Sequence, residues 1–381
     1  MALFSSKAER VSVALIDINS SSVGGALAHI QTTGQPAVYY TNRLPIEVHG
    51  DEDISAAMLR TLDELAEILT KKGAPILRQE TKSGHVDRVF ISIGAPWQAT
   101  AVRTEHVNET KPFIFTKAFL TEITRKSSAV QDGYMLSGES VIATLLNGYE
   151  VEHPFGKKVN RAELIILSSL VQKEVADSIE KVLRKTYHTH ALTLTAFAPI
   201  AYTVFRDIFP HEKDFLVLDV SGEATDTAFI KRGLLVDVSS VTHGVNELVR
   251  KAHDAAKNIS TGNSNPAINL DILPNARFSR EVEESQKVWI DTLTATLREF
   301  STKNALPRTL FLLADDESRD YLKNLLDSPD LRTLWLTDEP LAIIPILPSQ
   351  FSAFIKSRAE AGNDIYLSLL TMFANRQVNS S

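Results

Sequence analysis

Residues 215–230, FLVLDVSGEATDTAFI, consist of two apolar, β-rich runs joined by a short turn. β-branched and aromatic residues favour strands, and small polar residues favour the turn between them. Such a turn can bring backbone N–H groups and a hydroxyl against a phosphate, while an acid at the strand end faces Mg²⁺. The segment therefore predicts a β-hairpin with an anion-binding turn. Its candidate site residues are Asp219, Ser221, Gly222, Thr225 and Asp226.

A weaker copy of the same hairpin opens the chain at residues 11–23, VSVALIDINSSSV. Asn19 stands where glycine would be best, and asparagine tolerates a positive φ. Two such hairpins, about 200 residues apart, predict two related halves that close on one cleft. The alternative for each is an ordinary solvated turn. In the first copy the facing acid would be Asp17, and the phosphate donors would be Ser20, Ser21 and Ser22.

Three departures weaken the prediction of phosphate binding. Glu223 places a carboxylate in the second turn, and two like charges about 4 Å apart cost on the order of 4 kcal/mol at an effective dielectric near 20. Ser221 stands where glycine would allow the closest backbone approach. A nucleotide cleft of this type also needs a glycine-rich turn after a late strand, where the adenosine lies against bare backbone, but Thr309–Leu313 continues into the acidic run 314–317, ADDE. These acids are expected to cap the following helix instead.

Hydrophobic periodicity predicts a chain that mixes helices and strands throughout. The helix over residues 54–73 is expected to stop at Gly73, and the last helix is expected to dock on the core. The predicted strands are 11–16, 24–30, 37–46, 88–93, 101–107, 140–147, 162–170, 192–195, 215–219, 227–231, 234–239, 309–313 and 333–336. The predicted helices are 54–73, 116–130, 172–187, 199–209, 244–257, 280–303, 318–326 and 364–375.

The order of these elements divides the chain into four segments. Residues 1–98 have the outline of half of a two-domain fold, and residues 99–190 are typical of a small inserted α+β domain. Residues 191–213 return to the first domain, and residues 214–381 form the second. The chain is long enough for two or three domains with cores of their own.

Composition limits the classes of function. A formal net charge of −7 and a pI near 5.8 argue against a general nucleic-acid-binding protein, which would carry a basic face. The absence of cysteine excludes disulfides, thiolate metal sites and a cysteine nucleophile. No apolar run approaches the roughly 18 residues of a membrane span. We therefore expect a cytoplasmic protein that does not itself cross a membrane.

The two hairpins together make the chain resemble the FtsA/PilM branch of the actin-like ATPase superfamily, with PilM the nearer type. Residues 16–23, IDINSSSV, are similar to the opening Asp-Ile-Gly-Ser-Ser-Ser motif of that branch. Residues 219–226, DVSGEATD, are similar to its Asp-Ile-Gly-Gly-Gly-Thr-Thr-Asp motif. Gly244 falls where these proteins carry a Gly-Gly turn before a helix, and residues 148–166 are similar to a segment of their extra small domain.

The resemblance implies an α/β, actin-like fold of two ribonuclease-H-like domains, with the small α+β domain inserted in the first half. A fourth subdomain is expected to be reduced or absent because the polar loop at 258–276 is short. ATP and Mg²⁺ would bind between the halves, with Asp17 and Asp219 on the metal, although the altered glycines predict weak or lost binding. The site residues carried over are Asp17, Asn19, Ser20, Ser21, Ser22, Asp219, Ser221, Gly222, Thr225, Asp226 and Gly244.

The resemblance further implies a cytoplasmic scaffold at the inner face of the cell membrane, with catalysis not its main role. Its expected partner is the cytoplasmic segment of an inner-membrane protein in a type IV pilus or secretion assembly, and the scaffold could self-associate. Two alternatives stay open: an FtsA-like cell-division scaffold, and an active ATPase or sugar kinase of the same superfamily. A kinase would need a sugar-side base and intact phosphate glycines, and the sequence offers neither.

Overall fold

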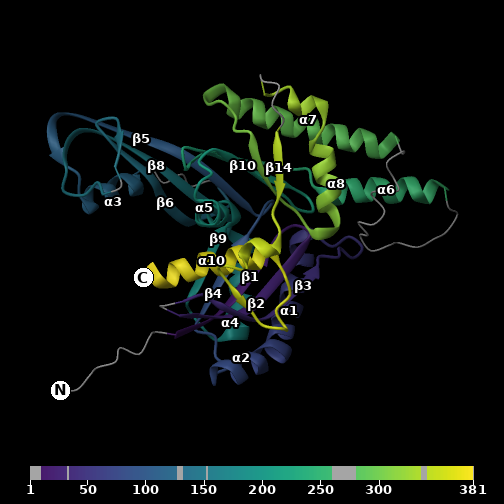
Figure 1. Ribbon diagram of the computed structural model, residues 1–381. Helices are drawn as coiled ribbons and strands as arrows, with labels where there is room; N and C mark the ends of the chain where they lie inside the picture. Colours follow the sequence, from purple (N-terminus) through teal and green to yellow (C-terminus); the bar gives the residue numbers. More distant parts are fainter. Residues whose placement is uncertain are drawn as a thin grey trace, which may run out of the picture.

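The two predicted hairpins lie at the centres of two separate sheets in the computed structural model (Figure 1). The structure describes residues 10–31, 34–126, 132–151, 153–259, 280–335 and 341–380. The strand order is β15-β3-β2-β1-β4-β9 in the first sheet and β12-β11-β10-β13-β14 in the second. The bounds are β1 (Arg10–Ile18), β2 (Ser22–Gln31), β3 (Ala37–Pro45), β4 (Arg88–Ile93), β9 (Leu192–Ala196), β15 (Lys356–Ser357), β10 (Phe215–Val220), β11 (Thr225–Lys231), β12 (Leu234–Val241), β13 (Thr309–Leu313) and β14 (Ala342–Pro345).

Both sheets repeat one pairing pattern. Each central strand, β1 or β10, pairs antiparallel with the next strand and parallel with a later one, β4 or β13. The second strand of each hairpin pairs antiparallel with a third, and a further parallel strand follows on the other side. The prediction of two related halves is therefore confirmed. Since the topology is the same, the two hairpin turns occupy equivalent positions.

Two helices fill the space between the sheets. α5 (Phe197–Ile208) and α10 (Ile365–Ser380) share one buried core with apolar residues from β1, β2, β10 and β13. α10, drawn yellow, lies beside β1 and β2 (Figure 1). Its buried residues include Leu369, Leu370 and Phe373, so the predicted docking of the last helix on the core is confirmed.

Other helices cover the outer faces of the two sheets. On the first sheet they are α1 (Ile54–Ile68), α2 (Ala74–Thr81) and α4 (Lys173–Tyr187), whose apolar residues pack with β1 and β4. On the second they are α6 (Val245–Ile259), α7 (Arg280–Lys303), α8 (Asp316–Leu326) and α9 (Pro329–Arg332). Each group of helices therefore buries the outer face of its sheet, and the hairpin turns are left at the junction between the halves.

A third sheet, of order β5-β8-β6-β7, projects away from the other two (Figure 1). Its strands are β5 (Gln98–Ile114), β8 (Lys158–Gln172), β6 (Tyr134–Leu146) and β7 (Tyr149–Glu150), and α3 (Lys117–Lys126) lies against it. The predicted pairing of the strands at 140–147 and 162–170 is confirmed in the ladder between β6 and β8. Of the helix expected over 116–130, residues 127–130 lie outside the described chain.

The prediction that a helix stops at Gly73 is wrong. α1 runs into a π-helical turn, η1 (Leu69–Gly73), and the chain continues directly into α2. A Cβ on Gly73 would lie 2.9 Å from side-chain atoms of both Leu27 and Tyr40. The glycine therefore allows the helix to approach the sheet closely, and its φ of −80° is ordinary for a helix.

The prediction of a strand at 333–336 is also wrong for residues 333–335, which the structure describes. Ser328 caps α9 by accepting a hydrogen bond from the backbone N–H of Leu331 at 3.3 Å, and Pro329 occupies the first turn, where proline is tolerated. Thr333 is the helical C-cap of α9, and Leu336 lies outside the described residues. The edge strand β14 follows instead at Ala342–Pro345.

Packing leads us to propose two changes to the predicted domain boundaries. α4 packs with α1 and the first sheet, so we propose that the inserted domain ends near Gln172 rather than at residue 190. β15 pairs with β3, and α10 contacts β1 and β2, so we propose that the chain returns to the first domain after about residue 350. Most of the loop at 258–276 lies outside the described residues. Among the described helices, none is long and apolar enough to cross a membrane.

Candidate functional site

The side chain of Asn19 closes the first turn, between β1 and β2. Its carbonyl oxygen accepts hydrogen bonds from the backbone N–H groups of Ser21 and Ser22, both at 2.9 Å. It also accepts from their hydroxyls at 2.8 and 3.3 Å. Asn19 is not among the described residues with positive φ, so an Asx-type turn, and not a left-handed backbone, replaces the missing glycine. The backbone N–H groups and hydroxyls of Ser21 and Ser22, predicted to donate to phosphate, therefore donate to Asn19.

Arg43, on β3, lies beside Asp17 at the end of β1. Its guanidinium donates to Asp17 at 2.9 Å, to Asp364 at 2.7 and 3.2 Å, and to Ser22 Oγ at 2.9 Å. It also lies 5.2 Å from the ring centroid of Tyr366. A guanidinium has five donors in a rigid fork, which suits two carboxylates and a hydroxyl at once. Arg43 therefore supplies the positive charge that a metal was predicted to bring to Asp17.

Gly24 makes room for this guanidinium. It is the register partner of Asp17 on β2, and a Cβ there would lie 2.4 Å from Nη2 of Arg43. Burial raises the pKa of Asp17 above its usual range; Arg43 opposes this shift and Asp364 adds to it. Burial alone would lower the pKa of Arg43, but the carboxylates of Asp364 and Asp17 raise it well above its usual range.

The second turn, between β10 and β11, contacts the first turn directly. The hydroxyl oxygens of Ser20 and Ser221 lie 2.9 Å apart, and Ser20 Oγ accepts a hydrogen bond from the backbone N–H of Glu223 at 2.8 Å. Both serines are buried. A phosphate between the turns would have to displace this contact. The N–H of Glu223, which a phosphate would need, is already bonded to the other half of the protein.

The N-terminus of α6 is bonded to the second turn. The backbone N–H groups of Val245 and Asn246 donate to the carbonyls of Ser221 and Gly222 at 3.0 and 2.8 Å. A Cβ on Gly244 would lie 2.4 Å from both of those carbonyl oxygens. Helix N-termini commonly bind anions through free N–H groups. Here Gly244 lets the helix end approach the turn so closely that these N–H groups bond the turn itself.

Glu223 has cationic and amide partners within the second half. Arg250, on α6, donates to both of its carboxylate oxygens at 2.7 and 2.9 Å, and Asn246 Nδ2 donates at 3.0 Å. Burial would raise the pKa of Glu223, but the hydrogen bonds from Arg250 and Asn246 outweigh it and the pKa is lowered. The carboxylate therefore stays charged, and it occupies the guanidinium of Arg250 and the amide of Asn246.

The remaining polar residues of the second hairpin also have partners within the protein. Asp219 accepts a hydrogen bond from the hydroxyl of Tyr366 on α10 at 3.0 Å. Thr225 Oγ1 donates to the carbonyl of His243 at 2.7 Å and accepts from Trp289 Nε1 at 2.9 Å. The Thr225 hydroxyl, predicted to face a phosphate, is fully buried in this network.

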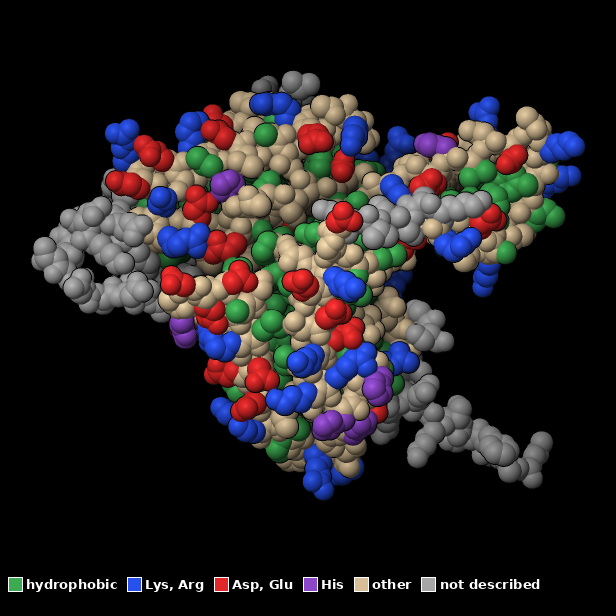
Figure 2. Space-filling view, turned by 180° about the vertical axis from the view of Figure 1, so that it is seen from behind, with side chains coloured by type: hydrophobic (Ala, Val, Ile, Leu, Met, Phe, Trp, Pro, Cys, Tyr) green, Lys and Arg blue, Asp and Glu red, His purple; other side chains and the backbone are tan. Residues whose placement is uncertain are grey.

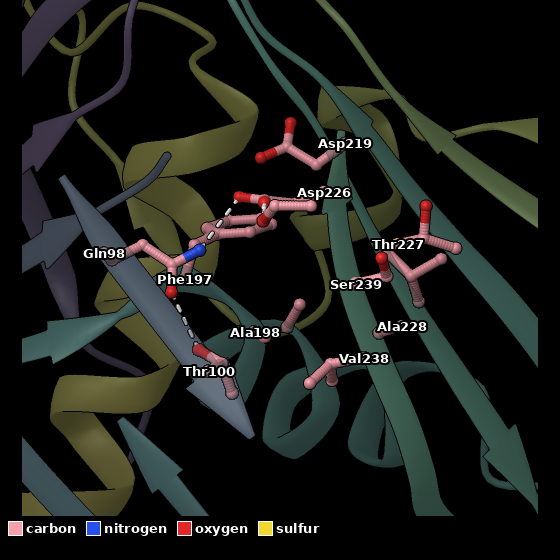
Figure 3. Close-up of a pocket in the computed structure, with 13 residues that line it drawn as sticks. Gln98, Thr100, Phe197, Ala198, Asp219, Asp226, Thr227, Ala228, Val238 and Ser239 are labelled. Atoms are coloured by element: carbon pink, nitrogen blue, oxygen red, sulfur yellow. Dashed lines mark hydrogen bonds between the residues drawn. The ribbon is translucent and has the colours of Figure 1, made fainter. Parts of the chain in front are cut away.

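Asp226 faces a small cavity under the hairpin (Figure 3). It accepts hydrogen bonds from Gln98 Nε2 at 3.3 Å and from the hydroxyl of Ser240. Burial raises its pKa, against these hydrogen bonds. Thr227 lines the same cavity, and its buried hydroxyl has no hydrogen-bond partner among the described residues. The volume, about 20 Å³, is sufficient for one water molecule.

The acidic run at 314–317 only partly fulfils the predicted capping role. Asp315 is at the N-cap of α8, but its side chain makes no capping bond, and its Oδ2 lies 3.4 Å from Oγ of Ser21. Beside it is a cavity of about 520 Å³ between the first turn, α6, α8 and α10. Its acidic and basic lining residues are one guanidinium and five carboxylates: Arg43, Glu47, Asp315, Asp316, Glu317 and Asp364.

Replacing Asp219 with asparagine is expected to stabilise the protein at pH 7. Burial raises the pKa of Asp219 well above its usual range; Asp226 adds to this and the Tyr366 hydrogen bond opposes it. A folded-state pKa above the unfolded value means that stability is greatest at low pH and falls as pH rises toward the folded pKa. Asparagine removes the charge but keeps an acceptor for Tyr366.

The expected gain is about 1–2 kcal/mol in the free energy of unfolding, because the cost of removing a buried polar group from water is about 1–3 kcal/mol and asparagine carries no charge. Urea denaturation at pH 7 and near pH 4 would measure it, and the gain should shrink at the lower pH. Asp291→Asn, at an exposed ion pair, is the matched control. Equal or lower stability of Asp219→Asn at pH 7 would contradict this assignment.

The structure therefore brings the predicted residues of both turns together with Gly244. It adds five that sequence reasoning missed: Arg43, Asn246, Arg250, Asp364 and Tyr366. Only Arg43 had a sequence signal. Gly24 interrupts a strand, and a glycine inside a strand often marks the close approach of another group, which here is the Arg43 guanidinium. Asp364 and Tyr366 gave no comparable signal, since they come from the far end of the chain.

Comparison with known proteins adds a fold but no sequence family. No protein-family model matches the sequence, and no curated protein matches it. A chain of the PilM–PilN type IV pilus biogenesis complex is similar in structure, with a TM-score of 0.59 and 14% identity over 96% of this chain and 99% of that one. A Bacteroides thetaiotaomicron protein of actin-like ATPase fold and unknown function has a TM-score of 0.42 and 10% identity, over 97% and 98%. EutJ from Carboxydothermus hydrogenoformans has a TM-score of 0.40 and 10% identity, over 96% and 89%.

Two sheets of the same topology, with their hairpin turns against each other, define an actin-like ATPase fold. In this fold the chain is similar, over 96% of its length, to a chain of the PilM–PilN complex.

Proposed function

We propose that this chain is an actin-like scaffold of the PilM type, in which the phosphate end of the nucleotide cleft is closed by the protein's own side chains. The observation that carries the proposal is the direct hydrogen bonding of the two hairpin turns through Ser20, Ser221 and Glu223. A nucleotide-binding protein of this fold needs those groups free for phosphate. A scaffold needs a fixed arrangement of its halves, which this contact supports.

The residues present do not fit ATP and Mg²⁺ as they are arranged. Asn19 occupies the N–H groups of the first turn, and the N–H groups at the start of α6 bond the second. Arg43 occupies the carboxylate of Asp17, and Tyr366 that of Asp219. Opening this network would leave buried polar groups unpaired, at about 1–3 kcal/mol each. We infer that the residues predicted to bind nucleotide hold the halves together instead.

The partner proposed for this scaffold is the cytoplasmic segment of a membrane-anchored assembly protein, at the inner face of the membrane. Its support is the similarity in fold to a chain solved in the PilM–PilN complex. Affinity capture from detergent-solubilised membranes, read by mass spectrometry, tests it. Specific recovery of a membrane protein of a pilus or secretion assembly is expected, and recovery of a tubulin-like division protein would favour the division scaffold.

An assay of ATP turnover and phosphoryl transfer separates the scaffold from an active kinase or ATPase. We expect the purified chain to show no turnover above background, and Asp219→Ala to leave that background unchanged. Turnover that Asp219→Ala abolishes would contradict the closed cleft and establish an enzyme.

A further inference from the structure

The far end of the third sheet exposes apolar side chains that the core does not use. This distal end consists of residues 108–126 and 147–161, where β5 ends, β7 lies, β8 begins and α3 packs. Ile114 is 58% exposed, Tyr149 77% and Phe155 45%. They make up three of the seven large exposed apolar side chains in the described part of the chain, although this end is a small fraction of its length. The apolar surface is therefore concentrated here.

The exposed side chains are held on an ordered support. Phe115 is fully buried and stacks on Phe155 with the ring centroids 6.0 Å apart. The backbone N–H of Gly156 donates to the carbonyl of Phe115 at 2.8 Å, and that of Phe115 donates to Lys157 at 2.9 Å. Phe155 is therefore presented outward by a fixed turn.

Basic residues surround these apolar side chains. The distal end contains seven Lys and Arg against four Asp and Glu, a formal charge of +3 in a chain whose net charge is −7. Five of these cations are exposed and form no ion pair with another described residue, although Lys117 lies 5.8 Å from the ring centroid of Phe155: Lys111, Lys117, Lys157, Lys158 and Arg161. Figure 2 shows hydrophobic and basic side chains together at the end of the projecting sheet.

We propose that the distal end of the third sheet docks on an anionic phospholipid surface. Tyr and Phe side chains partition to the interface of a bilayer, and nearby Lys and Arg are attracted to anionic headgroups. The apolar residues come from three separate segments at the end of a projecting sheet. A surface of this shape can enter the interface of a bilayer without first binding a partner peptide. Charge complementarity selects an anionic surface over a neutral one.

Vesicle sedimentation with the full chain tests this proposal. The probes are vesicles of phosphatidylcholine alone and vesicles that also contain phosphatidylglycerol. We expect binding only to the anionic vesicles, and weaker binding at raised salt because the attraction is screened. Ile114→Ser/Tyr149→Ser/Phe155→Ser and Lys157→Glu/Lys158→Glu should each weaken binding about tenfold or more.

Matched controls keep the result specific to this end. Val288→Ser/Leu347→Ser removes apolar side chains that are 46% and 40% exposed elsewhere, and should change binding less than twofold (about 0.4 kcal/mol or less). Lys72→Glu/Lys323→Glu is the charge control. Thermal unfolding checks that every variant is folded, and Tyr149→Trp should show blue-shifted emission on anionic vesicles alone.

Three results would overturn the proposal: no binding of the wild type to anionic vesicles, equal loss in the controls, or self-association of the wild type through this end. The last would be read by sedimentation velocity as a dimer that the serine variant dissociates. Since the vesicles contain no protein, the result is independent of whether the membrane-anchored partner is captured.

Discussion

Replacing Arg43 with leucine is expected to lower the free energy of unfolding by about 3–5 kcal/mol at pH 7. The variant leaves Asp17 and Asp364 without the guanidinium that bonds both of them. Asp17 is almost fully buried, so its unpaired charge would lie at a site from which water is excluded. Breaking a buried ion pair from one side costs far more than losing a surface pair.

The loss should depend on pH in a defined direction. The pKa of Asp17 is already raised by burial, and removing Arg43 removes the main opposing effect. The carboxyl would then bind a proton more readily in the folded state, so the penalty is largest at pH 7 and smaller near pH 5. Urea denaturation at both pH values measures this difference.

Two further variants serve as controls for Arg43. Arg43→Lys keeps the charge but not the fork of donors, and should recover only part of the loss. Arg332→Leu breaks an ion pair with Asp327 whose side chains are both about half exposed, and should cost less than about 1 kcal/mol. A loss below about 1 kcal/mol for Arg43→Leu, or one that is the same at both pH values, would show that Arg43 does not hold this cluster together.

Gly244→Ala is expected to destabilise the protein by about 3 kcal/mol. Its Cβ would lie 2.4 Å from the carbonyl oxygens of Ser221 and Gly222, which are backbone atoms and cannot rotate away. The same carbonyls accept the hydrogen bonds that begin α6, so relief of the clash would break them. Overpacking costs about 1–3 kcal/mol, and each lost hydrogen bond about 1 kcal/mol.

Gly138→Ala is the matched control for this substitution. A Cβ at Gly138 would meet nothing within 4 Å, and its φ is not in the left-handed region. Replacing a glycine where alanine fits stabilises by about 0.4–1 kcal/mol, through the unfolded state. Opposite signs for the two variants in urea denaturation are the expected result. Equal stability of the Gly244 variant and the wild type would rule out the close contact between α6 and the second turn.

Local pattern was enough to predict the architecture. The two hairpins were readable because each strand run is uninterrupted and each ends in an acid and small polar residues, as at Asp17 and Asp219. Their equivalence in two sheets then followed from topology. Gly73 was misread because a glycine inside a helix can mark either an end or a close approach to another element. Only the positions of Leu27 and Tyr40 distinguish these two roles.

The use of the cleft residues could be predicted only in part. Asn19 is recognisable in the sequence as a departure from glycine. Composition does not specify, however, that its side-chain carbonyl accepts hydrogen bonds from both of the N–H groups that follow it. The ligands of the two acids come from β3 and α10, far away along the chain. No periodicity relates Arg43 to Asp364. Partners brought together by tertiary packing therefore decide whether an acid at a strand end faces a metal or a side chain.

Calorimetric titration of the purified wild-type chain with Mg-ATP tests the proposed closed cleft most directly. If the two turns, Arg43 and α6 occupy the groups that a nucleotide would need, the titration should show no saturable heat up to about 1 mM, a binding free energy weaker than about −4 kcal/mol. Saturable binding with a Kd in the micromolar range, lost on omission of Mg²⁺ and in Asp17→Ala, would contradict the proposal.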